Sequence, residues 1–193
     1  MPFWCHVDTN ESTWEEPVVT GRKGVTPVIC ACLGQHVKVL ELLAEEGAWI
    51  ASIDNSGRSG LHIAAAQGAV DVIAFLLDPP VQGVDPVDVL SKDLSGWTPL
   101  HHAARFGHQN ICKTIIESID RLFQQRYPQP SDRVYRKILH QIKAKDNDDS
   151  TPLDHANLHN KRDAAEFVRA MQSSYHQLDA AAPRQERSQT KKK

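Results

Sequence analysis

The sequence predicts an all-α solenoid of about four repeated units, with a short β fragment before the first of them. Two observations predict this fold class. The first is a turn–helix–turn stretch of twelve residues that returns, with variations, along the chain. The second is that each copy is followed by another apolar stripe at helical spacing. The most complete copy reads Gly96-Trp97-Thr98-Pro99-Leu100-His101-His102-Ala103-Ala104-Arg105-Phe106-Gly107.

This stretch contains the start and the end of a short helix. Thr98 is suited to cap the helix, and Pro99 suits its first turn, where no amide hydrogen is needed. Leu100 and Ala104 lie on one apolar stripe, and Gly107 is suited to end the helix in a left-handed conformation. A helix of about two turns is not stable alone in water. The pattern therefore predicts that the helix stacks on similar neighbours.

Three further copies supply those neighbours. One begins at Gly24, one at Gly57 and a shorter one at Ser150. The first two starting points are 33 residues apart. The second apolar stripes, in chain order, lie at residues 37–43, 70–77, 111–116 and 164–168. The repeating unit is therefore a turn, a short helix, another turn and a longer helix.

The unit resembles the ankyrin repeat, which has a period of 33 residues and the signature Thr-Pro-Leu-His-x-Ala. The third copy matches this signature completely from Thr98 to Ala103, whereas the second has Ser59 at the threonine position. The last copy has Asp154 in place of the histidine. The resemblance covers residues 21–171. It implies repeats at about 21–53, 54–92, 93–145 and 146–171, which together form a domain over 18–171.

Two insertions interrupt the period. Residues 79–86 contain three prolines, which favour a stiff extended loop over a helix. Residues 118–145 predict a helical hairpin, because Pro128 breaks the longer helix and a new apolar row begins at Val134. This hairpin carries a net charge of +5. It supports an alternative function, a regulatory or nucleic-acid-associated protein that uses the basic insertion; the other interpretation is a solvated face of a packing helix.

The two ends of the chain do not share the repeat. Residues 1–17 resemble the second and third strands of a WW domain, a small sheet that binds proline-rich peptides. That resemblance implies that Phe3 and Trp14 form the ligand slot, although the family's first strand has no counterpart here. The alternative is an acidic strand pair of net charge −4 that binds nothing. Residues 172–193 are expected to form a disordered tail.

Composition narrows the classes of function. The net charge of −2 gives no overall bias toward binding nucleic acid. The sequence contains no apolar run of about 18 residues, so it predicts no membrane span. The four cysteines form no disulfide framework, which predicts reduced thiols in the cytoplasm or, as the alternative, the nucleus. No phosphate loop, nucleophile motif or zinc spacing is present. We therefore expect no catalytic residue, metal site or cofactor, and hence no enzyme.

The ankyrin resemblance implies a protein–protein interaction module, an adaptor or scaffold that binds a partner protein on its concave face. It assigns His62 and His101 to hydrogen bonds between neighbouring repeats. Partners of such proteins meet the hairpin tips and the exposed positions of the first helices, where Leu33 and Leu158 are also found. The expected binding residues are Asn55, Arg58, Gln67, Leu94, Trp97, Arg105, Phe106 and Asp148.

Four of these binding residues belong to the third repeat and are expected to form one cluster. Aromatic and arginine side chains dominate binding energy at interfaces, which favours this cluster as the centre of the site. The alternative is that Trp97 and Phe106 pack on each other or under an insertion. A proline-rich peptide is the second expected ligand, whereas nucleic acid and a membrane are not expected partners.

Overall fold

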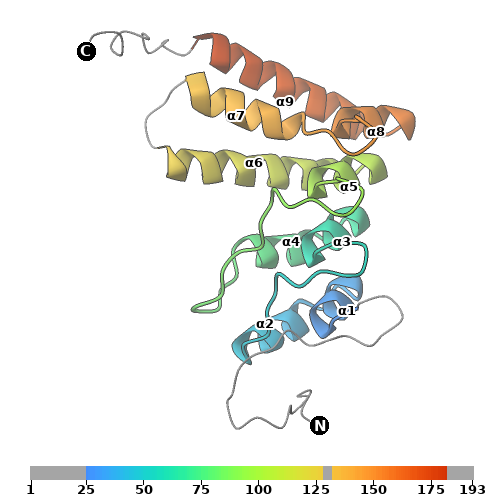
Figure 1. Cartoon of the computed structure of the whole chain (residues 1–193), viewed down its shortest axis with the longest axis vertical. Coiled ribbons are helices and arrows are strands. Elements are labelled where there is room, and N and C mark those ends of the chain that lie inside the picture. The colour runs from blue at the N-terminus through green and yellow to red at the C-terminus, as the bar shows by residue number, and fades with distance from the viewer. Residues whose placement is uncertain (1–24, 128–131, 182–193) are drawn as a thin grey trace, which may run out of the picture.

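The computed structural model describes residues 25–127 and 132–181, and within them the chain forms nine α-helices and no strand. Figure 1 shows these helices stacked in layers from the N-terminal to the C-terminal end. The predicted all-α class is confirmed, and the predicted β fragment at 1–17 lies outside the described residues. The helices are α1 (Pro27–Leu33), α2 (Val37–Glu45), α3 (Gly60–Gln67), α4 (Val70–Leu77), α5 (Pro99–Phe106), α6 (Gln109–Arg126), α7 (Asp132–Ile142), α8 (Pro152–Leu158) and α9 (Arg162–Ala181).

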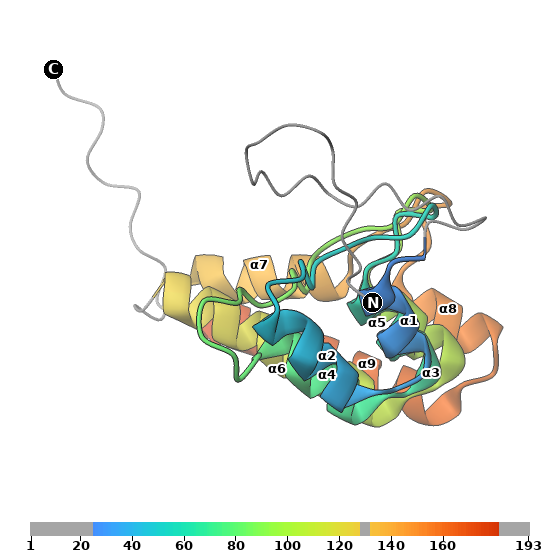
Figure 2. The same ribbon diagram turned by 90° about the horizontal axis from the view of Figure 1, so that it is seen from below.

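The helices form two parallel columns. The short first helices α1, α3, α5 and α8 pack on one another in chain order, and the second helices α2, α4, α6 and α9 form the other column. Figure 2 shows that the loops joining successive repeats gather on one side of the first helices. Leu61, Ile73, Leu100 and Ile115 are buried between the columns, so one core runs through the whole stack.

The first helices begin as their sequence predicts. In α5, Thr98 and His101 form a capping box, and α3 has the same arrangement. In α8 the carboxylate of Asp154 replaces the imidazole and accepts a hydrogen bond from the backbone N–H of Thr151 at 2.9 Å. Either side chain satisfies an amide that the helix start leaves unpaired. The departure of the last copy from the signature therefore leaves the helix start intact.

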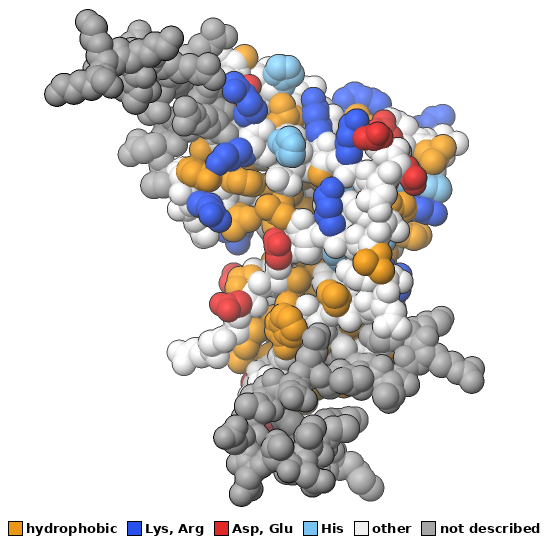
Figure 3. Space-filling view, viewed as in Figure 1, with side chains coloured by type: hydrophobic (Ala, Val, Ile, Leu, Met, Phe, Trp, Pro, Cys, Tyr) orange, Lys and Arg blue, Asp and Glu red, His pale blue; other side chains and the backbone are white. Residues whose placement is uncertain are grey.

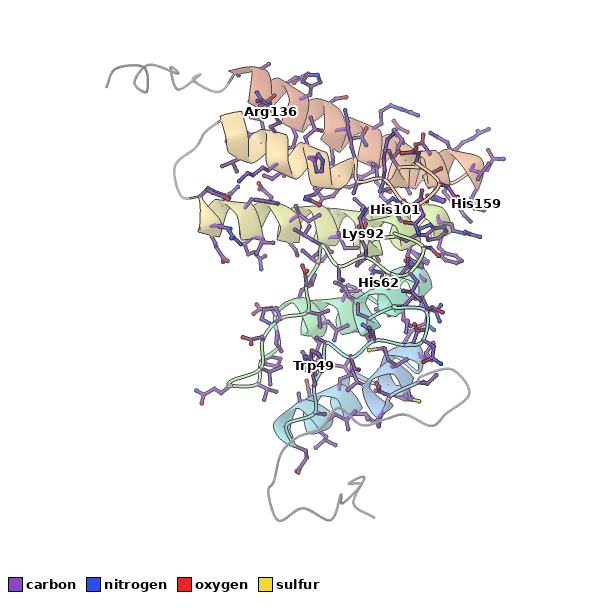
Figure 4. The ribbon with its side chains drawn as sticks, viewed as in Figure 1. Trp49, His62, Lys92, His101, Arg136 and His159 are labelled. Carbon is purple, nitrogen blue, oxygen red and sulfur yellow. The ribbon has the colours of Figure 1, made fainter. Side chains whose placement is uncertain are left out.

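The loop between α4 and α5 follows the outside of the stack. Residues 78–98 contain no helix, in agreement with the prolines of the first insertion. The backbone N–H of Val87 donates to the carbonyl of Leu76 at 2.8 Å, and the side chains of Val87 and Val89 are buried. Lys92, labelled in Figure 4, donates to the carbonyl of Lys145 at 2.7 Å. The first contact holds the loop against α4, and the last joins it to the segment after α7.

The second insertion forms the predicted helical hairpin. Helix α6 has 18 residues and α7 has 11. Val134, Ile138 and Ile142 form the buried row of α7, which packs against both α6 and α9. Figure 1 shows α7 alongside these two long helices. The hairpin therefore widens the stack at its C-terminal end.

The predicted start of a disordered tail at residue 172 is wrong, because α9 continues to Ala181. The added length of α9 packs along α7, and the side chain of Tyr175 is buried. The insertion supplies an apolar surface that an ordinary last repeat would lack, and burial against it offsets the entropy cost of ordering the segment. Residues 182–193 lie outside the described part of the chain.

Candidate functional site

Three hairpin tips join the repeats, and an aspartate organises each of them. These are Asp54, Asp93 and Asp146, whose Oδ1 atoms accept hydrogen bonds from the backbone N–H groups two and four residues later at 2.8 to 2.9 Å. The turn also requires a positive φ, which Gly57 and Gly96 adopt at 73° and 77° and an aspartate adopts in the last tip. Each tip is therefore internally fixed before any partner binds.

Neighbouring tips are also joined to one another. The backbone N–H of Leu94 donates to the carbonyl of Ser56 at 3.0 Å. In the next pair of tips, the N–H of Asn147 donates to the carbonyl of Ser95 at 3.1 Å, and its side-chain amide donates to the carbonyl of Leu94 at 2.9 Å. The three tips consequently form one continuous edge of the molecule.

The Oδ2 atom of each tip aspartate pairs with another side chain, which is an arginine in the first tip and a histidine in the other two. In the first tip, Arg58 Nη2 lies 2.6 Å from Asp54 Oδ2. In the last tip, His155 Nε2 lies 2.7 Å from Asp146 Oδ2, and His102 pairs with the middle aspartate in the same way at 3.0 Å. These aspartate–histidine pairs were not predicted. Their signal in the sequence is a histidine nine residues after the tip aspartate, which occurs in two of the three tips.

Arg58, one of the expected binding residues, therefore has a structural role in its own tip. Burial raises the pKa of Asp54. The hydrogen bonds and charge of Arg58 and the amide of Ser56 together lower it by more, so the net shift is downward. The arginine side chain remains 44% exposed. It can contact a partner only through the part of the guanidinium that faces away from Asp54.

His62 and His101 link successive repeats, as the resemblance implies. The backbone N–H of Ser59 donates to His62 Nδ1 at 3.2 Å, so the proton of this imidazole is on Nε2 and is donated to the carbonyl of Trp97 at 3.1 Å. His101 Nε2 reaches the carbonyl of Ser150 at 3.3 Å in the same way. Figure 4 shows the two histidines at successive levels of the stack. Burial lowers the pKa of both imidazoles to about 4, which keeps them neutral at pH 7.

The indole of Trp97 lies among side chains of two repeats. Its ring centroid is 4.4 Å from that of His155 and 5.0 Å from that of His102, and the guanidinium of Arg105 lies 4.9 Å above the indole. Trp97 is therefore half-buried, and among the described residues its ring contacts are with histidines and Arg105, not with Phe106. The exposed part of the indole is what remains available to a partner.

The expected cluster in the third repeat is only partly formed. Trp97 and Arg105 are in contact, but Leu94 lies on the hairpin tip and Phe106 lies at the other end of α5. Leu94 is 72% exposed, and Phe106 is 47% exposed and stacks on His108 with ring centroids 6.5 Å apart. The four side chains therefore contribute to an extended surface instead of one compact patch.

A row of exposed side chains follows the last residues of the four first helices. Leu33 is 46% exposed at the end of α1, and Leu158 is 78% exposed at the end of α8. Between them lie Gln67 at the end of α3 and Phe106 at the end of α5. Gln67 Nε2 donates to the carbonyl of Leu33 at 3.1 Å, which links the first two members. This row, together with the three tips, is called the tip-and-helix face below.

The remaining expected binding residues lie either on the first and last tips or outside the residues that the structure describes. Asn55 and Asp148 are exposed on the first and last tips. Phe3 and Trp14 lie outside the described residues. Within 25–127 and 132–181, no group of three His, Cys, Asp or Glu side chains is placed to hold a metal ion. No helix in that part of the chain combines the length and apolar character needed to span a bilayer.

Comparisons with known proteins agree with this geometry. A family model described as ankyrin repeats (3 copies) matches residues 5–88 and 83–179. The chain is 28% identical over 141 residues to ankyrin repeat domain-containing protein SAT10 of Stachybotrys chartarum, covering 73% of this chain and 7% of that protein. It is 30% identical over 135 residues to NAD-dependent deacetylase sir2B of Dictyostelium discoideum, covering 67% and 17%. It is 38% identical over 64 residues to protein phosphatase 1 regulatory subunit 12A of Mus musculus, covering 33% and 6%. The chain thus spans 17% or less of the length of each relative.

Proposed function

Because the chain belongs to the ankyrin-repeat family, we propose that it is a protein-interaction module, an adaptor or scaffold that binds a partner protein on the concave tip-and-helix face. The proposed function includes no catalytic step. The proposed binding residues are Asn55, Arg58, Gln67, Leu94, Trp97, Arg105, Phe106 and Asp148, to which the exposure of the first-helix ends adds Leu33 and Leu158.

The observation that carries this proposal is the exposed apolar row on the first helices. Leu33, Phe106 and Leu158 recur at one structural position in three repeats, and each is at least 46% exposed. A folded protein gains little from leaving such side chains in water, whereas a partner that covers them gains about 25 cal/mol for each square ångström buried. Because the tips are already fixed by their own hydrogen bonds, little ordering entropy would be lost on binding.

The relatives support a binding module more than an enzyme. One of them is named a regulatory subunit of protein phosphatase 1. Another is named a deacetylase, but this chain corresponds to 17% of its length, so the likeness supplies no reason to assign deacetylation here. We propose that the chain acts as a soluble regulatory protein in the cytoplasm or the nucleus.

Replacing Phe106 with alanine should weaken partner binding by at least about 2 kcal/mol, the threshold for an interface hot spot. The aromatic side chain is exposed at the centre of the row, so its loss should change the fold little. Affinity purification with mass spectrometry would first identify a partner, and titration calorimetry would then compare the variants. The matched control is Leu42→Ala on α2, which removes an apolar side chain that is 60% exposed on the other column. Equal affinity of Phe106→Ala and the parent, with loss of binding by Leu42→Ala, would refute the assignment.

We also propose, on the likeness to WW strands alone, that Phe3 and Trp14 bind a proline-rich peptide. A fluorescent proline-rich peptide should bind the intact chain and lose most of its affinity with Trp14→Ala. Deleting residues 1–17 should leave the melting temperature of the repeat domain nearly unchanged, because the first repeat motif begins only at Gly24. A peptide that binds the Trp14→Ala variant like the parent would exclude the aromatic slot.

A further inference from the structure

The helical hairpin insertion forms a groove that the repeat stack does not account for. The groove has a volume of about 350 Å³ and lies between the C-terminal half of α6, helix α7 and the loop that joins α4 to α5. Leu90, Leu122, Phe123 and Tyr127 give it an apolar lining. Figure 3 shows hydrophobic side chains at this corner of the molecule, with Lys, Arg and His side chains around them. The groove is on the column opposite to the first helices, and so is separate from the tip-and-helix face.

The apolar lining is exposed because α6 is longer than its neighbour in the stack. Figure 1 shows that α6 extends well past the end of α4, so the second repeat does not cover its last turns. Leu122 and Tyr127 are consequently exposed, and the ring of Phe123 stacks on that of Tyr127 at 6.4 Å. Contiguous exposed apolar side chains of this kind are typical of interaction sites.

The charged side chains among the described lining residues of the groove are cationic. Lys137 Nζ lies 3.9 Å from the ring centroid of Tyr127 and donates to its hydroxyl at 2.6 Å. This hydrogen bond lowers the pKa of Tyr127. The ammonium has three donors, and among the described residues one hydroxyl accepts from it, so two donors are left there for an acceptor. Arg126 and His140 lie on the same rim, and none of the described lining residues is an aspartate or glutamate.

We propose that this groove binds an acidic segment of a partner protein, in which a large apolar side chain stands between carboxylates. The apolar side chain would fill the space over Leu122 and Phe123, and the carboxylates would pair with Arg126 and Lys137. Charge complementarity of this kind selects acidic partners and repels basic ones. The site is independent of the proposed concave binding face, so either proposal can fail without the other.

Nucleic acid is the less suitable occupant on the same observations. Single-stranded nucleic acids bind to open aromatic faces and to a continuous track of cations. Here Tyr127 already contacts both Phe123 and the ammonium of Lys137, so less of its ring is open for a base to stack on. The groove offers two strong cations on one short rim. A carboxylate needs no stacking surface and fits the fork of a single arginine.

The test uses the full chain and a library of random displayed peptides. Peptides are first depleted on the double variant Arg126→Glu/Lys137→Glu and then selected on the parent. The selected sequences should carry several Asp or Glu residues around Leu, Phe or Trp, and raised salt should weaken their binding. In fluorescence titrations, Lys137→Glu and Leu122→Ala should each lower the affinity by about tenfold or more.

Matched controls separate the groove from the rest of the surface. Lys113→Glu reverses an exposed charge on α6, far from the groove end of that helix, and Leu42→Ala removes an exposed leucine on α2. Both variants should bind the selected peptides like the parent. Circular dichroism confirms that every variant is folded. The proposal is overturned if no peptide survives depletion, if the survivors are neutral or basic, or if the groove variants bind them normally. It is also overturned if an RNA oligonucleotide or anionic vesicles bind in a groove-dependent way while acidic peptides do not.

Discussion

Lowering the pH from 7 to about 4.5 should destabilise the repeat domain by several kcal/mol, before most carboxylates are protonated. The cause is the pair of buried imidazoles, His62 and His101, which link successive repeats. Burial lowers the pKa of each to about 4 from an ordinary 6.5. Burial also lowers the pKa of His102, although its hydrogen bond to Asp93 opposes the shift.

The sign of the effect follows from proton uptake. Between pH 6.5 and about 4 the unfolded chain binds protons on these histidines and the folded chain does not, so stability falls as the pH falls through that window. The stabilisation is complete above pH 6.5. At pH 4.5 the loss is about 2–3 kcal/mol for each of the two imidazoles, since one pKa unit corresponds to about 1.4 kcal/mol. The tip carboxylates act at a lower pH, because the pKa values of Asp54 and Asp146 are lowered as well.

Urea unfolding followed by circular dichroism at several pH values measures this dependence directly. His101→Asn should be less stable than the parent at pH 7 and should lose a large part of the slope of stability against pH. His140→Gln, a change to an exposed histidine on α7, is the matched control and should keep the full slope. A parent whose stability is constant from pH 6.5 to 4.5 would contradict the assignment of neutral, buried imidazoles.

The repeat itself could be predicted because its signals act over a few residues. Thr98 caps α5, Pro99 begins it and Leu100 faces the core, and each of these depends only on local spacing. The replacement of histidine by Asp154 is harmless for the same reason, because a carboxylate accepts the same amide hydrogen bond. The long α6 and the separate α7 were also predictable from apolar rows and prolines alone.

The features that could not be predicted depend on segments that are far apart in the chain. The length of α9 depends on the surface that α7 provides, and helical spacing within 162–181 contains no information about that surface. The environment of Trp97 is completed by His155 from the next repeat, and this contact could not be inferred from the place of Trp97 on a tip. The groove of the hairpin likewise depends on Leu90, which comes from the loop before α5.

Replacing Leu100 with alanine should lower the free energy of unfolding by about 2–5 kcal/mol. The side chain is 1% exposed, and α5 packs between α3 and α8 at the middle of the stack. The substitution removes buried methyl groups and leaves a cavity, and closing that cavity would require several helices to move together. Because each repeat is stabilised mainly by its neighbours, the loss should weaken the contacts of the third repeat with both sides of the stack.

Leu94 provides the matched control in the same repeat, since Leu94→Ala makes the same chemical change at a side chain that is 72% exposed. That variant should change the free energy of unfolding by less than about 0.5 kcal/mol. Urea denaturation of the parent and both variants at pH 7 gives the comparison, with helical ellipticity confirming that each is folded at the start. If Leu100→Ala and Leu94→Ala have the same midpoint, then Leu100 does not lie on the core face of α5. If both are strongly destabilised, the hairpin tip is part of the folding core, and its role as a preformed binding edge would have to be abandoned.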